Sequence, residues 1–205
     1  MIWRREHRER GASLVEFALI APLLLLLLFG IIEFGFAWRD KIVVGNAVQT
    51  STRVGAALGN DIDVDLFILE SATQGVSNLS GGGADLVSHV DIFEVNSLGN
   101  PVPGELNRYF YTFVDGPGPL CDWTPCPQGS SGYVGWSWTP DERDVEVGNL
   151  DVIGVRIVYA HNWITGGLVP LPDSNCDNAA LPAAPTNCWT EQSIMRLEPL
   201  QFGLP

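Results

Sequence analysis

Four cysteines have the most obvious chemistry in this chain, because neighbouring thiols form either disulfides or metal sites. They occur in two local pairs with internal gaps of four and eleven residues, Cys121 with Cys126 and Cys176 with Cys188. These are not the spacings of a zinc ribbon, and no metal site is predicted. Three disulfide pairings are possible. The local one, Cys121–Cys126 and Cys176–Cys188, closes the shortest loops and is the favoured prediction.

A group of aspartates gives a weaker signal. Asp61, Asp63 and Asp65 have the spacing that begins an EF-hand loop. The sixth position of that loop is Leu66 rather than Gly and the twelfth is Ala72 rather than Glu, so calcium cannot be held in that manner. Acidic residues are favoured at the N-terminus of a helix, and the group is interpreted as such a start.

His89 and His161 each lie in an apparent strand, and neither has a neighbouring nucleophile or metal ligand in the sequence. A structural role is the interpretation for both. The sequence also lacks the G-x-S-x-G, H-E-x-x-H and glycine-rich phosphate-binding motifs. We therefore predict no enzyme activity and no cofactor.

Glu16 is the most unusual carboxylate, because it lies at the start of a long apolar segment. From Phe17 to Ile32 the sequence carries no charge. The range 12–38 is long enough, at about 40 Å as a helix, to cross a hydrocarbon core of about 30 Å. A carboxylate in that phase is strongly disfavoured unless it is paired or protonated. Glu16 therefore requires an explanation that a plain membrane anchor does not supply.

The charge of the chain is unevenly distributed. The net charge is −13, from 11 basic and 24 acidic residues, and such an acidic chain repels nucleic-acid phosphates. Basic residues before a membrane span favour a cytoplasmic N-terminus, and they occur here as Arg4, Arg5, Arg8 and Arg10. The remainder of the chain is then expected outside the cytoplasm. Glu33, near the outer end of the segment, is expected to face water or to pair with Arg39 or Lys41.

Three interpretations of the apolar segment compete. A secretory signal peptide would be cleaved after Ala37, where Gly35-Phe36-Ala37 loosely matches a small-x-small site. The length of the run and the presence of Glu16 argue against it. An uncleaved single-pass anchor explains the length but not Glu16. A prepilin-type signal is cut on the cytoplasmic side of the apolar helix, which stays on the mature protein.

The residues around the segment support the prepilin-type signal. The chain reads RRERGASLVEF, so that a basic leader ends at Gly11, Ala12 becomes the new N-terminus, and Glu16 is the fifth residue after the cut. Together with GASLVEFALIAPLLLLLLFGIIEFG and NAVQTSTRVGAA, this resembles the TadE-like family of Flp (tight adherence) pilus components. The resemblance covers about residues 8–60, and it extends less closely to 150–200 through DVIGVRIVYAHNW and IMRLEPL.

The resemblance implies a minor pilin or pseudopilin of a Flp (Tad) pilus, which acts in pilus assembly and surface adherence. A prepilin peptidase would process it between Gly11 and Ala12. The expected partners are the membrane, that peptidase and other pilus subunits, which are contacted through the N-terminal helix. The expected location is the cell membrane, with a single span and an outer C-terminal domain, or an extracellular pilus. The alternative is an uncleaved single-pass protein whose outer domain binds a ligand or partner.

Cleavage would also give Glu16 a role in assembly. It would create an α-ammonium group at Ala12, with an ordinary pKa near 8. Ammonium and carboxylate of neighbouring subunits would then pair and set the register of one helix against another. The alternative is that Glu16 simply lies among the lipid headgroups.

The expected fold is α+β. A basic leader (1–11) and a transmembrane helix (12–38) precede an outer domain (39–205), in which the first helix continues to about residue 59 with an amphipathic pattern. A second helix is expected after Asp61 or Asp63. Its apolar face consists of Ile62, Leu66, Leu69, Val76 and Leu79.

A small antiparallel sheet is expected to pack on the membrane-distal half of the first helix. Its strands are predicted from runs of β-branched and aromatic residues, at 86–95, 108–114, 133–138, 151–159 and 189–197. Loops are predicted at 115–132 and 170–187. Tryptophans of the outer domain are interpreted as core residues, with an exposed adhesive or carbohydrate-binding face as the alternative. They are Trp123, Trp136, Trp138, Trp163 and Trp189.

Overall fold

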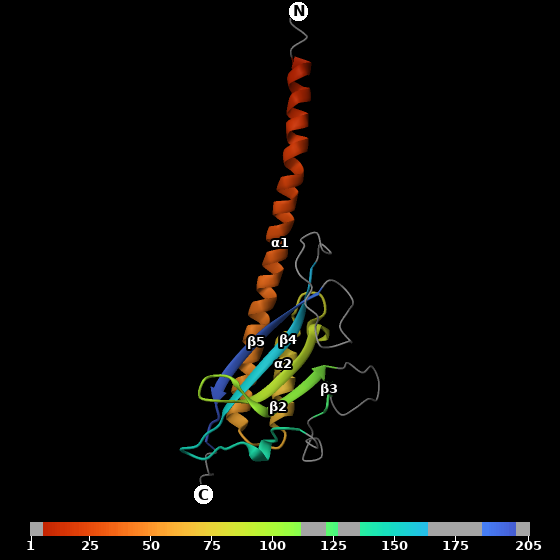
Figure 1. Ribbon diagram of the computed structural model, residues 1–205. Coiled ribbons are helices and arrows are strands. Elements are labelled where there is room, and N and C mark those ends of the chain that lie inside the picture. The colour runs from red at the N-terminus through yellow and green to blue at the C-terminus, as the bar shows by residue number, and fades with distance from the viewer. Residues whose placement is uncertain (1–5, 112–121, 127–135, 164–185, 200–205) are drawn as a thin grey trace, which may run out of the picture.

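The computed structural model describes residues 6–111, 122–126, 136–163 and 186–199 (Figure 1). It confirms the α+β class, because a long N-terminal helix and a second helix pack on an antiparallel sheet. The helices are α1 (Glu6–Leu58) and α2 (Val64–Val76). The strands are β1 (Val87–Val95), β2 (Pro101–Tyr111), β3 (Trp123–Thr124), β4 (Val152–Asn162) and β5 (Thr186–Arg196). Short 3₁₀ turns occur at η1 (Gly83–Leu86) and η3 (Pro140–Glu142).

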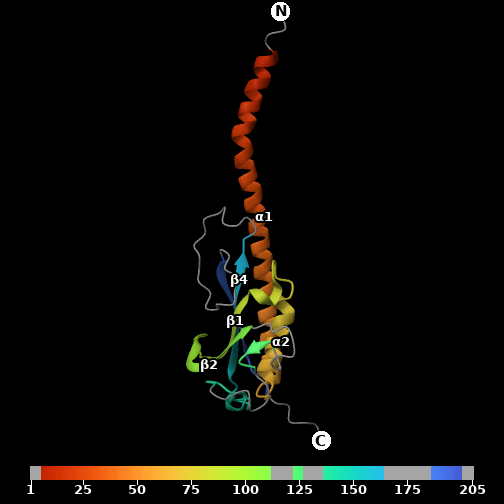
Figure 2. The same cartoon turned by 90° about the vertical axis from the view of Figure 1, so that its right-hand side faces the viewer.

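The helix α1 has an uncovered first part and a packed second part (Figures 1 and 2). Its buried side chains begin at Glu33 and recur every three or four residues, which is the spacing of one helix face. They are Glu33, Ala37, Asp40, Val44, Ala47, Val48, Ser51, Thr52 and Ala56. The buried hydroxyls of Ser51 and Thr52 donate to the carbonyls of Ala47 and Val48, at 2.8 and 2.7 Å. Both hydroxyls on this buried face of α1 are therefore hydrogen-bonded.

Small residues let the two helices approach closely. A Cβ added to Gly75 of α2 would lie 2.8 Å from the Cα of Ala47 in α1. A Cβ on Gly55 would lie 2.7 Å from the Cδ1 of Ile68. Gly55 weakens the helical propensity of α1, but the contact with α2 requires it. The helix then ends at Gly59, which has a φ of +60 and donates its N–H to the carbonyl of Gly55 at 3.0 Å.

The predicted second helix is present, but its buried face differs from the prediction. Ile62 precedes α2 and is 47% exposed, and Leu66 is only half-buried. The core-facing side consists of Val64, Asp65, Ile68, Leu69, Ala72 and Val76. Leu69, Val76 and Leu79 of the predicted face are buried. The prediction missed Asp65 because the three aspartates were interpreted only as the start of the helix. Asp65 instead occupies a core position beside Val64.

The sheet has the order β3-β2-β1-β4-β5, and all neighbouring strands are antiparallel. Both helices lie on one face of it, as Figure 2 shows. On β4, side chains alternate between the two faces of the sheet, as predicted from the sequence. Those that point toward the helices are fully buried, and they are Ile153, Val155, Ile157 and Tyr159. The core of the domain lies between this face and the helices.

Several predicted strand boundaries were wrong. β2 begins at Pro101 rather than at residue 108, because Asn96 closes a tight connection by accepting the N–H groups of Leu98 and Asn100. β3 lies within the loop predicted at 115–132, and β5 begins at Thr186, within the loop predicted at 170–187. Of the strand predicted at 133–138, residues 133–135 lie outside the described residues and 136–138 are not in a strand.

Asp65 is the centre of a buried polar network. Arg143 donates to Oδ1 of Asp65 at 2.6 Å. The side-chain amide of Asn107 donates to Oδ2 of Asp65 at 3.2 Å, and the hydroxyl of Tyr109 donates to the same oxygen. The guanidinium of Arg143 also stacks on the ring of Trp138 at 4.4 Å. Asn107 exchanges hydrogen bonds with the backbone of Trp138. The network therefore attaches the segment that carries Trp138 and Arg143 to α2 and β2.

A second carboxylate, Asp91 of β1, is buried on the opposite face of the sheet. Its direct neighbours across the ladder are Arg108 of β2 and Arg156 of β4. Arg108 Nε donates to Asp91 Oδ1 at 2.7 Å and Arg156 Nε to Oδ2 at 3.0 Å. Burial on its own raises the pKa of Asp91, but the hydrogen bonds and charges of the two arginines outweigh it and lower the pKa below its ordinary value.

Asp91 therefore makes the stability of the folded domain depend on pH. A carboxyl with a lowered folded-state pKa stabilises fully above its ordinary pKa of about 3.9, and the stabilisation is lost as the pH falls through the folded-state value. We predict that Asp91→Asn lowers the free energy of unfolding at pH 7 by about 3–5 kcal/mol and flattens its decline in acid. Urea unfolding of the micelle-bound chain, followed by tryptophan fluorescence at a series of pH values, measures both.

The control is Asp141→Asn, which removes an exposed carboxylate from the turn η3. It should leave the pH profile unchanged. If Asp91→Asn and Asp141→Asn gave the same profile, the two arginines would not stabilise the charged form of Asp91.

Candidate functional site

The candidate site is the uncovered part of α1 together with the end of the domain beside it. Within the described residues, α1 is the one helix that is long and apolar enough to cross a membrane, with a mean hydropathy of 2.7 in its most apolar window. That window is not buried by the domain. Between Ser13 and Ile32 no side chain is fully buried, and most are exposed. A helical segment of about 20 residues measures about 30 Å, the thickness of a hydrocarbon core.

The residues predicted for processing and assembly lie at the start of this segment. Gly11 and Ala12 belong to α1, but their side chains lie outside the described residues. Glu16 is exposed on the helix surface, between the exposed Val15 and Phe17. Its carboxylate would therefore face lipid or a neighbouring helix if the segment spans a membrane, so the cost of an unpaired carboxylate applies to it.

Aromatic rings gather where the uncovered helix meets the domain. We call Phe34, His161, Trp163 and Trp189 the aromatic collar. The ring of His161 stacks on Trp189 with centroids 5.3 Å apart and meets Trp163 edge-on at 4.8 Å. Phe34 of α1 contacts Trp163 edge-on at 6.5 Å. Aromatic side chains of this kind concentrate at membrane–water interfaces.

A buried hydrogen bond holds α1 against this end of the sheet. His161 Nδ1 of β4 lies 2.8 Å from Asp40 Oδ2 of α1, and both side chains are 1% exposed. Asp40 Oδ1 accepts the backbone N–H of Ser80 at 3.0 Å. The neighbouring Arg39 donates to the hydroxyl of Ser80, also at 3.0 Å. The structural role inferred for His161 is thus correct, but its partner is 121 residues away and was not predicted.

Glu33 was predicted to face water or to pair with Arg39 or Lys41, and this was wrong. It is 2% exposed and lies on the packed side of α1, two turns before Asp40. Arg39 donates to Ser80 instead. Lys41 lies 3.6 Å from Glu191 of β5. The prediction failed because the sequence does not reveal that the domain covers this face of the helix from Glu33 onward.

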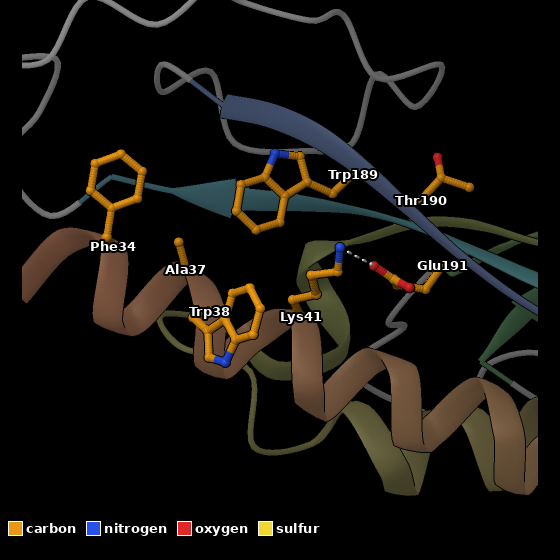
Figure 3. A pocket seen from close by; sticks show the side chains of 7 residues that line it. All are labelled: Phe34, Ala37, Trp38, Lys41, Trp189, Thr190 and Glu191. Atoms are coloured by element: carbon orange, nitrogen blue, oxygen red, sulfur yellow. Dashed lines mark ion pairs between the residues drawn. The ribbon is translucent and has the colours of Figure 1, made fainter.

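A groove of about 400 Å³ opens beside the collar, between α1 and β5 (Figure 3). Its charged groups are the ammonium of Lys41, which is 53% exposed, and the carboxylate of Glu191, which is 25% exposed. Its remaining lining is mostly apolar and consists of Phe34, Ala37, Trp38, Trp189 and Thr190. Deeper in the core, burial and then the carboxylates of Glu191 and Asp40 raise the pKa of Tyr159, so its phenol stays protonated.

The tryptophans divide between two environments. Trp123 and Trp138 are fully buried in the core, as predicted. Trp136 is half-buried and packs edge-on against Tyr109, with centroids 5.3 Å apart. Trp163 and Trp189 are also half-buried, but they form the collar. The interpretation as core residues therefore holds fully for two of the five.

The other candidates from the sequence form no reactive site in the described part of the chain. No group of three or more His, Cys, Asp or Glu residues is placed there to hold a metal ion. His89 is buried beside Ser88 and Phe110. Cys126 and Cys188 are disulfide-bonded. Cys121 and Cys176 lie outside the described residues, so the local pairing stays a prediction.

Comparison with known proteins identifies the N-terminal segment. Residues 11–53 match a family described as TadE-like protein. The match begins at Gly11 and includes the apolar part of α1 that the domain leaves exposed, together with most of the part that packs on the domain. It confirms the resemblance to the TadE-like family over these residues. No curated protein and no solved structure matches the chain.

The buried hydrogen bond between Asp40 and His161 gives a testable prediction. Because removing one partner leaves a buried polar atom of the other without its hydrogen bond, we expect Asp40→Ala and His161→Phe each to lower the free energy of unfolding by about 1–3 kcal/mol. In a double-mutant cycle the two should couple by at least about 1 kcal/mol. Urea unfolding of the micelle-bound chain measures these values.

Glu70→Gln, an exposed change on α2, is the control and should cost almost nothing. A coupling energy indistinguishable from zero would show that the pair does not hold α1 to β4.

Proposed function

We propose that this chain, TadE-like over residues 11–53, is a minor pilin or pseudopilin of a Flp (Tad) pilus that acts in pilus assembly and surface adherence. The observation that carries the proposal is an overlap. The family match over residues 11–53 contains the whole charge-free run from Phe17 to Ile32, which the domain leaves uncovered. The same segment therefore provides the prepilin-type signal and the membrane span.

A membrane location follows from the helix. Its uncovered length fits a single span, and the arginines before it favour a cytoplasmic N-terminus. The sheet and α2 would then lie outside the cytoplasm, with the aromatic collar at the outer membrane surface. The disulfide bonds of Cys126 and Cys188 suit an oxidising compartment. A structural role, rather than catalysis, accounts for the buried Asp40, Asp65 and Asp91, because side chains and backbone of the protein donate to their oxygens.

Processing between Gly11 and Ala12 would give Glu16 a partner. The new ammonium at Ala12 would lie four residues before Glu16, on the same side of the helix. Since Glu16 is exposed rather than packed against the domain, its carboxylate is accessible to the ammonium of a second subunit. Such a pair would fix the axial register between neighbouring helices.

The first prediction concerns the mature N-terminus. Mass spectrometry of the protein from membranes should find it at Ala12 in cells that contain the prepilin peptidase, and should find the leader retained in cells that lack it. Retention of the leader in both strains would instead indicate the uncleaved single-pass protein with a binding outer domain. An N-terminus at Trp38 would indicate a secreted protein. Either result would overturn the proposed processing.

The second prediction concerns Glu16. Glu16→Gln keeps the shape of the side chain but removes its charge, so processing should continue while pairing with the Ala12 ammonium is lost. We expect about tenfold less protein in the sheared filament fraction, because one charge-assisted interaction is lost. Glu70→Gln on the outer domain is the matched control. Unchanged incorporation of Glu16→Gln would show that this carboxylate has no assembly role.

A further inference from the structure

The groove between α1 and β5 begins at the level of the lipid headgroups if α1 spans the membrane, and this inference rests on that part of the proposed function. About 20 helical residues cross the hydrocarbon core, so a span that ends at Ile32, where the domain begins to cover α1, starts at Ser13. Phe34 and Trp38 follow by about 3 and 9 Å along the axis, and Lys41 by about 13.5 Å. The headgroup layer is about 5–7 Å thick, and the Lys41 side chain tilts back toward it.

The charges in the groove define what it can hold. Lys41 and Glu191 lie 3.6 Å apart, and both keep access to solvent. Their charges cancel, so the groove offers an anionic molecule no net attraction. A molecule that carries both a phosphate and an ammonium group complements both side chains, because the phosphate accepts from Lys41 while the ammonium donates to Glu191.

The apolar lining points to a lipid rather than to a free phosphate compound. Figure 3 shows Phe34 and Trp38 on the same stretch of α1 as Lys41, with Trp189 facing them from β5. Phe34 is 61% exposed and Trp38 67% exposed, which is typical of side chains that contact the interface between headgroups and acyl chains. Ala37, at the base of the groove, is small and leaves room between the rings.

We propose that this groove binds the headgroup of a phosphatidylethanolamine in the outer leaflet. The primary ammonium of this lipid has N–H donors for Glu191, which the quaternary ammonium of phosphatidylcholine lacks. An anionic lipid such as phosphatidylglycerol supplies the phosphate for Lys41 but leaves Glu191 opposite a like charge. Binding would exchange the direct contact between Lys41 and Glu191 for two charge-assisted contacts with the lipid.

The test uses the full chain in two steps. Flotation with phosphatidylcholine vesicles first establishes whether the chain enters a bilayer at all. Short-chain phosphatidylethanolamine, phosphatidylcholine and phosphatidylglycerol are then titrated separately into the micelle-bound chain, and tryptophan fluorescence is recorded because Trp38 and Trp189 line the groove. We expect phosphatidylethanolamine to bind about tenfold more tightly than either of the other two lipids, because it makes one additional charge-assisted hydrogen bond.

Variants assign the preference to the groove. Glu191→Gln should abolish the preference for phosphatidylethanolamine over phosphatidylcholine, and Lys41→Met should weaken the binding of both. Glu70→Gln and Arg53→Met remove exposed charges elsewhere and should change neither. Unfolding in urea shows whether each variant is folded, and Glu191→Asp should recover part of the preference if the carboxylate is the recognising group.

Each outcome separates the two proposals. A chain that does not float with vesicles contradicts the proposed membrane span, and the lipid site with it. A chain that floats but binds all three lipids equally, or binds phosphatidylglycerol most tightly, overturns the lipid site alone. The same holds if Glu191→Gln retains the preference.

Discussion

The structure depends on one constraint, which is that α1 is a single continuous helix whose first part is exposed and whose second part packs on the domain. Its first part is apolar on every side, which suits lipid or other helices. Its second part is buried along a single stripe, where polar groups would be costly unless the protein supplied their partners. Ser51 and Thr52 are satisfied within the helix itself. Asp40 requires His161 of β4 and the backbone of Ser80, and so it ties the helix to the domain.

The negative charge on the surface of the domain depends partly on where the basic residues lie. Arg143 is completely buried against Asp65, and Arg108 and Arg156 both bind the buried Asp91. These arginines neutralise carboxylates inside the fold, so most of the unbalanced acids remain for the surface. The structural importance of the few basic residues is therefore greater than their number indicates. The resulting excess of negative surface charge opposes the close approach of two such domains.

Regular features of the fold could be predicted from sequence, and long-range pairings could not. The apolar segment, the second helix and the alternation of β4 depend on local patterns that have a known period. The burial of Asp65 depends on Arg143, which is 78 residues away, and that of Asp40 on His161. Both acids look like solvent-exposed residues in their local sequence. The same reason explains the error at Glu33 and the failure to predict the groove, since β5 supplies one of its walls from the other end of the chain.

The distance in sequence between Asp40 and His161 also has a consequence for biosynthesis. A ribosome that adds about 5–20 residues per second needs about 6–24 s to make the 121 residues between them. During that time the packed part of α1 has no sheet to cover it. In the proposed membrane span, Glu33 and Asp40 would then still be in water, where they would resist being drawn into the bilayer behind the apolar segment. The acids that are buried in the finished domain would in this way limit how far the helix inserts.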